Sequence, residues 1–269
     1  MPSLKVTHAV VCRVPQSWAT AVGVDVDVAR REHEAFVRLL RELGLDVIEL
    51  PPDESLPFCP LTEDAAVVCN GSALITRPAN AARSKEVETI RAVLKKELDL
   101  PIIEIADENA KLEGGDVLFT GREFFVGISE FTNEAGARAV AAAFPEFPCT
   151  PVKVSGSSHL KSLVSMAGPE LMCVSSGKNS QEVLKRIERE ATYSYQTLTV
   201  PEDKAANVLY INGTLIHCSQ EEIPQSTKAL GERIDYPRKA VNVQALTKKG
   251  NGLSSCCLLL RRSRHIRSL

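Results

Sequence analysis

The sequence predicts an α/β fold in which five ββαβ units close into a ring, which is a five-bladed α/β propeller. Short β-rich hairpins recur about every 47 residues, a spacing typical of supersecondary repeats. Between the hairpins lie amphipathic helical segments, each followed by an extended return segment. A closed ring is the economical assembly of such units, because it leaves no repeat with an uncovered apolar face.

The hairpins are the clearest elements. Four of them are expected within the chain, at residues 65–78, 116–129, 163–176 and 207–219. Their turns are expected at Asn70-Gly71, Thr120-Gly121, Ala167-Gly168-Pro169 and Asn212-Gly213, and Asn-Gly is a strong hairpin signal. The fifth hairpin would pair the run beginning at Cys256 with the run "THAVVCRV" near the N-terminus, so that the two ends of the chain complete one unit.

The helices follow from the spacing of apolar residues. Helices are expected at residues 28–44, 85–98, 133–144 and 179–190, the last opening with a capping box from Asn179 to Glu182. Return strands are expected at residues 101–106 and 150–155. Because no linker or low-complexity segment divides the sequence, residues 1–269 are expected to form a single catalytic domain.

Composition excludes several classes of function. The net charge of -2 and the pI of about 6.3 argue against nucleic acid and against an anionic membrane as partners. The longest internal apolar stretch, residues 139–144, is too short to span a bilayer. The sequence therefore predicts a cytoplasmic protein with a small-molecule partner, whose eight cysteines are thiols. The cysteine spacing shows no structural zinc pattern.

Polar residues begin each hairpin. They are Glu63 and Asp64, Glu113 and Asp116, His159, and Cys256. Taken singly, the acids fit a solvated strand entry or a tight turn, the histidine fits a satisfied core or surface residue, and the cysteine fits a small core hydrophobe. Their recurrence at one phase of the repeat favours another interpretation. In a ring they would converge on the axis as a nucleophile, a base and several carboxylates.

These segments resemble the dimethylarginine dimethylaminohydrolase family of the pentein, or guanidine-modifying, superfamily. The resemblance is carried by "DENAKLEGGDVLFTGREFFVGIS" (107–129) and by "HAVVCRVP", "ELPPDESLP", "ALITRP", "SSHLKSLVSMAGP" and "LTVPEDKAAN", and it covers nearly the whole chain. It implies a five-bladed pentein propeller. It also implies hydrolysis of asymmetric dimethylarginine or monomethylarginine to citrulline and a methylamine, which indirectly relieves inhibition of nitric oxide synthesis. No cofactor is implied.

The resemblance also implies a role for each site residue. Cys256 would attack the guanidinium carbon and form a covalent thiouronium intermediate, and His159 would serve as general acid and then general base. Glu113 would orient His159. The implied substrate-binding residues are Glu63, Asp64, Arg83 and Asp116, with Arg83 gripping the α-carboxylate. No metal is required, although a stray Zn²⁺ at Cys256 and His159 would inhibit.

The neighbouring cysteines Cys256 and Cys257 pose a separate question. Successive residues on a strand face opposite ways, so at most one of them can face an axial pocket. A disulfide between them would need a strained backbone and an oxidising compartment. Cys256 matches the nucleophile of the family and Cys257 its neighbour.

Three departures from the family pattern bear on the substrate. Phe58 stands where many members carry an acid for the α-amino group, and Phe131 stands where they carry a second carboxylate-binding arginine. The segment 16–24, which corresponds to the flap over the substrate, looks short. In these features the chain resembles the divergent second vertebrate branch of the family.

Three hypotheses therefore stay open. The protein is a dimethylarginine hydrolase with a modified head-group clamp, a pentein hydrolase for another guanidine or amidine with an apolar tail, or a non-catalytic regulatory binding protein on the same scaffold. The basic tail 261–269 would offer a docking segment for the third hypothesis. The sequence leaves a monomer and a homodimer equally open.

Overall fold

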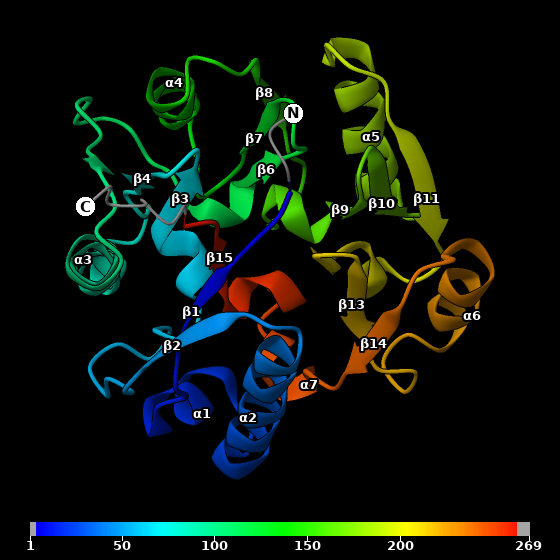
Figure 1. Cartoon of the computed structure of the whole chain (residues 1–269), viewed down its shortest axis with the longest axis horizontal. Coiled ribbons are helices and arrows are strands. Elements are labelled where there is room, and N and C mark those ends of the chain that lie inside the picture. Colours follow the sequence, from blue (N-terminus) through cyan, green and yellow to red (C-terminus); the bar gives the residue numbers. More distant parts are fainter. Residues whose placement is uncertain (1–3, 263–269) are drawn as a thin grey trace, which may run out of the picture.

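The structure is a computed structural model that describes residues 4–262. Within this range the chain forms five three-stranded sheets arranged around a common centre (Figure 1). In each sheet the middle strand pairs antiparallel with one neighbour and parallel with the other. This repeated topology confirms the predicted propeller of five ββαβ units.

The strands are short, and each sheet takes three of them. The first sheet contains β15 (Leu258–Leu260), β1 (His8–Cys12) and β2 (Asp46–Leu50), and the second contains β3 (Ala66–Cys69), β4 (Ser72–Ile75) and β5 (Ile102–Ile103). The other three contain β6 (Val117–Phe119), β7 (Phe124–Ile128) and β8 (Cys149–Lys153); β9 (Val164–Gly168), β10 (Leu171–Ser175) and β11 (Gln196–Val200); and β12 (Leu209–Ile211), β13 (Thr214–Cys218) and β14 (Arg238–Val241).

A helix connects the two parallel strands of each sheet, because parallel neighbours need a long crossover. In chain order these connections are α2 (Val26–Glu42), α3 (Ser84–Ala92), α4 (Glu134–Ala143), α5 (Lys178–Glu190) and α6 (Pro224–Arg233). The helix α3 continues as a π-helical turn, η3 (Val93–Glu97). Two further short helices, α1 (Gln16–Val22) and α7 (Gln244–Thr247), lie beside α2.

The two ends of the described chain meet in one sheet. Strand β15 pairs antiparallel with β1, with Ala9 opposite Leu259 and Val10 opposite Leu258. Strand β1 then pairs parallel with β2 along its whole length. This pairing confirms the expectation that the N-terminal segment completes the last hairpin.

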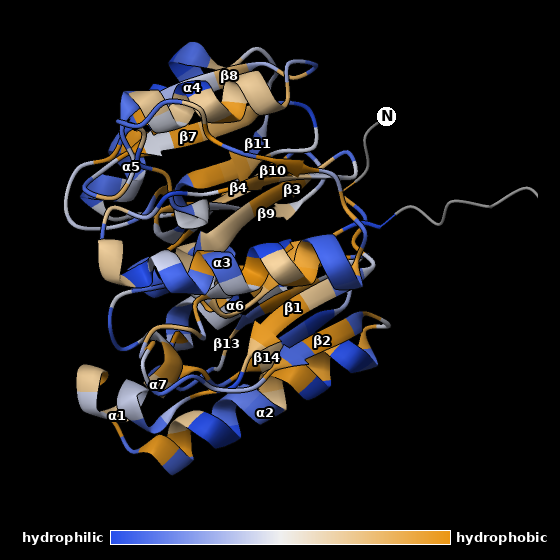
Figure 2. Cartoon of the chain, turned by 90° about the vertical axis from the view of Figure 1, so that its left-hand side faces the viewer, coloured by the Kyte–Doolittle hydropathy of each residue, from blue (hydrophilic) through white to orange (hydrophobic). Residues whose placement is uncertain are grey.

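The helices pack their apolar faces on the sheets and turn their polar faces outward (Figure 2). Helix α2 illustrates the cause. The Asp25 side chain accepts hydrogen bonds from the backbone N–H groups of Asp27 and Val28, which caps the first turn. Phe36 and Leu40, one helical turn apart, are fully buried. The core is therefore distributed among the blades and does not lie in one central layer.

A short 3-10 helix precedes the first strand of every sheet. These helices are η1 (Thr62–Ala65), η4 (Gly114–Asp116), η5 (Leu160–Ser162), η6 (Asp203–Ala206) and η7 (Leu253–Cys256). Neighbouring members of the set contact one another, η7 with η1, η1 with η4, η4 with η5, and η5 with η6. Because the polar signature residues lie in or beside these helices, the fold gathers them at the centre of the ring.

Three local expectations were wrong. Helix α5 begins at Lys178 after the N-cap Gly177, and the predicted capping box from Asn179 is absent from this described helix. The Oγ of Ser175 accepts the N–H of Gly177, and this turn starts the helix one residue earlier. The third expected hairpin, at residues 163–176, turns at Pro169 and Glu170 and not at Ala167-Gly168-Pro169, and Glu170 has a φ of 59°.

The segment expected to be a flap loop, residues 16–24, is mostly the helix α1. Its Trp18 is fully buried, and the indole Nε1 donates to the carbonyl oxygen of Ala245 at 3.3 Å. The helix start is held by Glu54, whose carboxylate accepts the backbone N–H groups of Gln16 and Ser17. This part of the chain is therefore docked on the body of the protein.

Among residues 4–262, no helix combines the length and the apolar character that crossing a membrane requires. The basic residues 263–269 of the tail considered as a docking segment lie outside the described residues.

Candidate active site

The site begins at η1, which holds two consecutive carboxylates. The hydroxyl of Thr62 donates to the carbonyl oxygen of Val10 at 2.9 Å, and that of Thr76 donates to the carbonyl oxygen of Asp64 at 2.7 Å. These bonds tie η1 to the strand β1 and to the end of β4. Glu63 and Asp64 are both buried, and they make contacts with different partners.

Asp64 faces Glu113 and His159. The His159 Nε2 lies 3.2 Å from Glu113 Oε1 and 3.8 Å from Asp64 Oδ1. The backbone N–H of Gly115 donates to Asp64 Oδ1 at 3.0 Å, which fixes the carboxylate from the η4 side. The ligand atoms of these three side chains lie within 4.8 Å of one another. One residue from each of three blades therefore forms a compact acid and histidine cluster.

Two glycines allow this close approach. A Cβ at Gly114 would lie 1.9 Å from the carbonyl oxygen of Glu63, so η4 and η1 meet backbone to backbone. A Cβ at Gly115 would lie 2.8 Å from His159 Cγ and 2.9 Å from Asp64 Oδ1. The "EGGD" sequence is thus required by packing at the centre of the ring.

Arg83 lies inside this cluster. Its Nη1 donates to Asp64 Oδ2 at 2.9 Å and to Glu113 Oε1 at 3.1 Å. Its Nη2 and Nε donate to Glu86, one helical turn further along the chain, at 2.9 Å and 3.1 Å. The guanidinium therefore bridges three buried carboxylates, whereas the sequence predicted that it would bind the α-carboxylate of a substrate.

The charges in the cluster shift one another. Burial alone lowers the pKa of His159, but the surrounding Asp64, Glu113 and Asp116 outweigh burial and raise it to about 9. Burial raises the pKa of Asp64, but His159 and Arg83 together hold it below its ordinary value. His159 is consequently protonated and Asp64 ionised at neutral pH.

Asp116 supports the segment next to His159 through hydrogen bonds. Its Oδ1 accepts the backbone N–H of Leu160 at 2.8 Å, and its Oδ2 accepts the hydroxyl proton of Ser129 at 2.7 Å. Burial raises the pKa of the Asp116 carboxyl. Both oxygens are thus used within the protein, and Asp116 holds the segment that follows His159.

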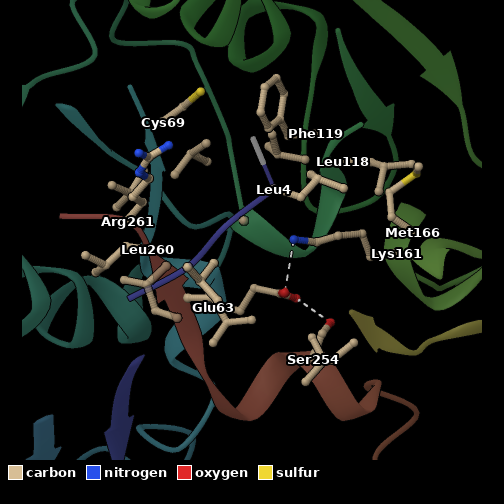
Figure 3. A pocket seen from close by; sticks show the side chains of 18 of the residues that line it. Leu4, Glu63, Cys69, Leu118, Phe119, Lys161, Met166, Ser254, Leu260 and Arg261 are labelled. Atoms are coloured by element: carbon tan, nitrogen blue, oxygen red, sulfur yellow. Dashed lines mark hydrogen bonds and ion pairs between the residues drawn. The ribbon is translucent and has the colours of Figure 1, made fainter. Parts of the chain in front are cut away.

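Glu63 faces a different space. It lines a cavity of about 700 Å³ together with Lys161, Ser254, Met166, Leu209 and Cys257 (Figure 3). Its carboxylate pairs with Lys161 Nζ at 3.0 Å and accepts the hydroxyl proton of Ser254 at 3.0 Å. Asp64, Glu113 and His159 are not among the described residues that line this cavity. The two neighbouring acids of η1 therefore serve opposite sides of the ring centre.

Cys256 ends η7 and is only 1% exposed. Helix η7 is held against η1 and η6, since Asn207 Oδ1 accepts the backbone N–H of Ser254 at 2.8 Å and Ser254 in turn bonds Glu63. Burial, with Glu63, Glu32 and Asp64 nearby, raises the pKa of the Cys256 thiol to about 12. Cys257, the C-cap of η7, lines the cavity of Figure 3 and Cys256 does not. Both residues precede β15, so the expected strand alternation does not apply to them.

The two phenylalanines that depart from the family pattern lie beside the cluster. The ring of Phe131 stacks on His159 with centroids 4.4 Å apart and planes 30° apart. The ring of Phe58 packs edge-on against Trp18, and the ammonium nitrogen of Lys249 lies 3.4 Å from its centroid. Burial and the charge of Arg83 lower the pKa of Lys249. Aromatic surface thus takes the place of charged groups around the site.

The structure brings Asp64, Arg83, Glu113 and His159 into direct contact and seats Cys256 on the neighbouring 3-10 helix. It separates Glu63 from that group. Among the described residues, Asp64, Glu113 and His159 form a group of three side chains that could hold a metal ion. The inhibitory pair of Cys256 and His159 stays a prediction.

Sequence reasoning missed the partners of these groups. Glu86 holds Arg83, Lys161 holds Glu63, and Lys249 covers Phe58. Glu86 follows Arg83 by three residues at a helix start, a spacing that could have indicated the pair. Lys161 and Lys249 carry no local signal, because their partners are distant in the sequence.

The chain is similar in sequence to known hydrolases over most of its length. The chain is 42% identical over 274 residues to a human protein named "Putative hydrolase DDAH2", with 96% of each chain covered. It is 26% identical to the N(G),N(G)-dimethylarginine dimethylaminohydrolase of Pseudomonas aeruginosa, with 88% of this chain and 89% of that one covered. No protein-family model matches the chain.

Solved structures agree with the fold. The dimethylarginine dimethylaminohydrolase of Pseudomonas aeruginosa, a cysteine-to-serine mutant complexed with citrulline, superposes with a TM-score of 0.80 at 24% identity, covering 95% of this chain and 100% of that one. The N-terminal domain of the cyanobacterial arginine dihydrolase ArgZ superposes with a TM-score of 0.75 at 15% identity, covering 95% and 98%.

The ring of five ββαβ blades places the protein in the pentein class of folds, which the two solved structures share. Within that class, the chain belongs to the dimethylarginine dimethylaminohydrolase family, with human DDAH2 among its relatives.

Proposed function

We propose that this protein hydrolyses Nω-methylated arginine to citrulline and a methylamine through a covalent intermediate on Cys256. One observation carries the proposal. The oxygens of Asp64 and Glu113 bind a guanidinium in this structure, that of Arg83, at 2.9 Å and 3.1 Å. Carboxylates fixed in this way suit a planar cation that must be held while a nucleophile approaches its carbon.

The chemistry follows from the charges. The thiol of Cys256 is protonated in the unliganded site, so it must release its proton to solvent before it attacks, and a cation bound beside it favours the thiolate. The thiolate sulfur would attack the guanidinium carbon, and His159 would donate its proton to the departing methylamine. Neutral His159 would then take a proton from water, whose oxygen attacks the thiouronium carbon. Breaking the carbon–sulfur bond releases citrulline and restores the thiolate.

The other site residues support this chemistry from outside the reacting atoms. Glu113 orients His159, and Asp116 holds the backbone after it. We expect Arg83 to meet the α-carboxylate when substrate is bound, and Glu63 to act on the site through η1. No cofactor is invoked. We expect the protein to act in the cytoplasm, as one catalytic domain, as a monomer or a homodimer.

A second candidate is hydrolysis of a guanidine with an apolar tail. It is favoured by the aromatic surface of Phe131 on His159 and of Phe58 near Lys249. A ligand tail without charge would pack on these rings, whereas the amino group of an amino acid would meet the aromatic ring of Phe58. Relative turnover of methylarginine and of a simple alkylguanidine distinguishes the two candidates.

The test is citrulline production from asymmetric dimethylarginine by the purified protein. We expect Cys256→Ser and His159→Ala to lower kcat by roughly 10³-fold or more, because each removes a group that acts on the reacting bonds. Cys149→Ser is the matched control, since Cys149 is a free thiol on β8 far from η7 in the chain. We expect it to retain activity within about twofold.

Two outcomes would contradict the proposal. If Cys257→Ser abolishes turnover and Cys256→Ser does not, the nucleophile is misassigned. If the wild-type protein produces no citrulline and Cys256 also resists alkylation by a chloroacetamidine, the regulatory binding protein becomes the better explanation.

A further inference from the structure

We propose that Cys12 and Cys59 are a pair of thiols that hydrogen peroxide converts to a disulfide, and that this bond fixes the segment 51–61 to the strand β1. The inference is independent of the proposed function, because neither cysteine belongs to the cluster of acids and His159.

The two thiols lie side by side although they are far apart in the sequence. Cys12 is the last residue of β1, and Cys59 lies in the segment between β2 and η1. Their Sγ atoms lie 3.7 Å and 3.9 Å from the same atom, the carbonyl oxygen of Arg13. The two thiols also hydrogen-bond to each other, and together with Leu56 they form a small buried cluster. The sulfurs are therefore neighbours in the reduced protein.

The backbone around Cys59 suits the formation of the bond. A disulfide is about 2.05 Å long, so hydrogen-bonded sulfurs must move closer to form it. Cys12 is held in β1 opposite Leu50 of β2. Cys59 lies outside the strands, in a turn where its N–H donates to the carbonyl oxygen of Leu56. Because residues 51–55 before this turn are all exposed, Cys59 is the partner whose backbone can follow its sulfur.

The same geometry decides which sulfur reacts first. The hydrogen bond from the Cys12 thiol lowers the pKa of Cys59, so Cys59 is the thiol that ionises more readily. The Cys59 thiolate attacks one oxygen of hydrogen peroxide, which breaks the O–O bond, leaves a sulfenic acid on Cys59 and releases hydroxide. The proton lost from Cys59 converts this hydroxide to water.

The second step closes the bond. The Cys12 sulfur attacks the Cys59 sulfur, the S–S bond forms, and the S–O bond breaks with release of a second hydroxide. The Cys12 proton converts that hydroxide to water. The two thiols have then lost two electrons and two protons, and one peroxide has been reduced to two waters.

The disulfide would act on the segment 51–61, which packs beside the candidate active site. Glu54 of this segment accepts the backbone N–H groups at the start of α1, and Phe58 packs against Trp18. The bond would close a loop that contains α1, α2 and β2, and closing a long loop stabilises a fold by restricting the unfolded chain. Oxidation is therefore expected to reduce local opening of the segment.

The experiment compares the full-length wild-type protein after treatment with stoichiometric hydrogen peroxide and after reduction with dithiothreitol. Peptide mass spectrometry without reduction identifies the crosslink. We expect a peptide pair joining Cys12 to Cys59 that dithiothreitol separates. We also expect amide hydrogen exchange over residues 51–61 to slow by at least about threefold in the oxidised protein, and the thermal midpoint to rise by roughly 5 °C.

Two kinds of variant keep the result interpretable. Cys12→Ser and Cys59→Ser should each abolish the crosslink and its effects on exchange and on the thermal midpoint. Cys69→Ser is the matched control, because Cys69 on β3 is a free thiol with the same 8% exposure as Cys59, and this variant should still form the crosslink. The peptide map of the wild-type protein decides the question even if a serine variant fails to fold.

The inference is overturned if the oxidised wild-type protein yields no peptide pair of Cys12 and Cys59. It is equally overturned if Cys59 is instead recovered as a sulfinic acid, or if peroxide joins only Cys256 to Cys257. A crosslink that leaves hydrogen exchange over residues 51–61 unchanged would refute the fixing of the segment.

Discussion

The protonation of a single residue, His159, couples the candidate active site to the stability of the folded protein. Its pKa is raised to about 9, against an ordinary value near 6.5, although burial alone would lower it. Its protonation therefore stabilises the folded state fully below pH ~6.5, and this contribution is lost as the pH rises through about 9. The shift corresponds to roughly 3 kcal/mol for this side chain, an order-of-magnitude figure.

We accordingly expect the free energy of unfolding to fall between pH 6.5 and 9.5 more steeply in the wild type than in His159→Gln, by roughly 2–3 kcal/mol. Urea unfolding at the two pH values measures the difference, and cysteine ionisation in the unfolded chain is common to both proteins. Parallel pH profiles for the two proteins would show that His159 is neutral in the fold.

The 3-10 helices set the geometry of the ring centre. Helix η4 touches η1 without intervening side chains, since a Cβ at Gly114 would meet the carbonyl oxygen of Glu63 at 1.9 Å. Gly114→Ala must therefore push two backbones apart, and we expect a loss of about 3 kcal/mol of stability together with most of the activity. Thermal unfolding and citrulline release measure the two effects.

Gly231→Ala is the control variant for Gly114→Ala. Its added Cβ would meet only the end of the Arg238 side chain, at 3.1 Å, and Gly231 lies within α6. Alanine favours a helix interior over glycine, so this variant should match or slightly exceed wild-type stability. Equal losses for the two variants would contradict the importance of the η4 and η1 contact.

An ion pair and a hydrogen bond join different blades of the ring across its centre. Glu63 of η1 pairs with Lys161 of η5, which belongs to a blade that is not adjacent, and with Ser254 of η7 (Figure 3). Lys161→Met leaves the Glu63 carboxylate buried without its cation, and burial already raises its pKa. We expect a loss of about 3–5 kcal/mol in urea unfolding.

Adding Glu63→Gln to Lys161→Met should recover most of this loss, because no buried charge then lacks a partner. Arg91→Met, which breaks an exposed pair with Glu104, should cost less than about 1 kcal/mol. A small effect of Lys161→Met, equal to that of Arg91→Met, would show that the central ion pair does not stabilise the ring.

Most elements and their order could be predicted from local signals, although helix α6 was not among the expected helices. Asn70-Gly71 and Asn212-Gly213 mark turns because both pairs adopt positive φ angles, at 48° and 75° and at 48° and 97°. The repeat predicted the ring, its closure by β15 and β1, and the residues that converge on the centre. The position of each signature residue within the repeat was enough to predict this convergence, because each of them lies at the start of a blade.

What only the tertiary structure decided is which of these residues touch. The sequence placed Glu63 and Asp64 together, but they serve opposite sides of the ring because successive residues diverge from a turn of 3-10 helix. The sequence assigned Arg83 to a carboxylate of the substrate, but three carboxylates from η1, α3 and the start of η4 hold it in the unliganded fold. Local patterns determine elements through backbone preferences, whereas pairing of buried charges depends on distances between segments far apart in the chain, which only the closed ring establishes.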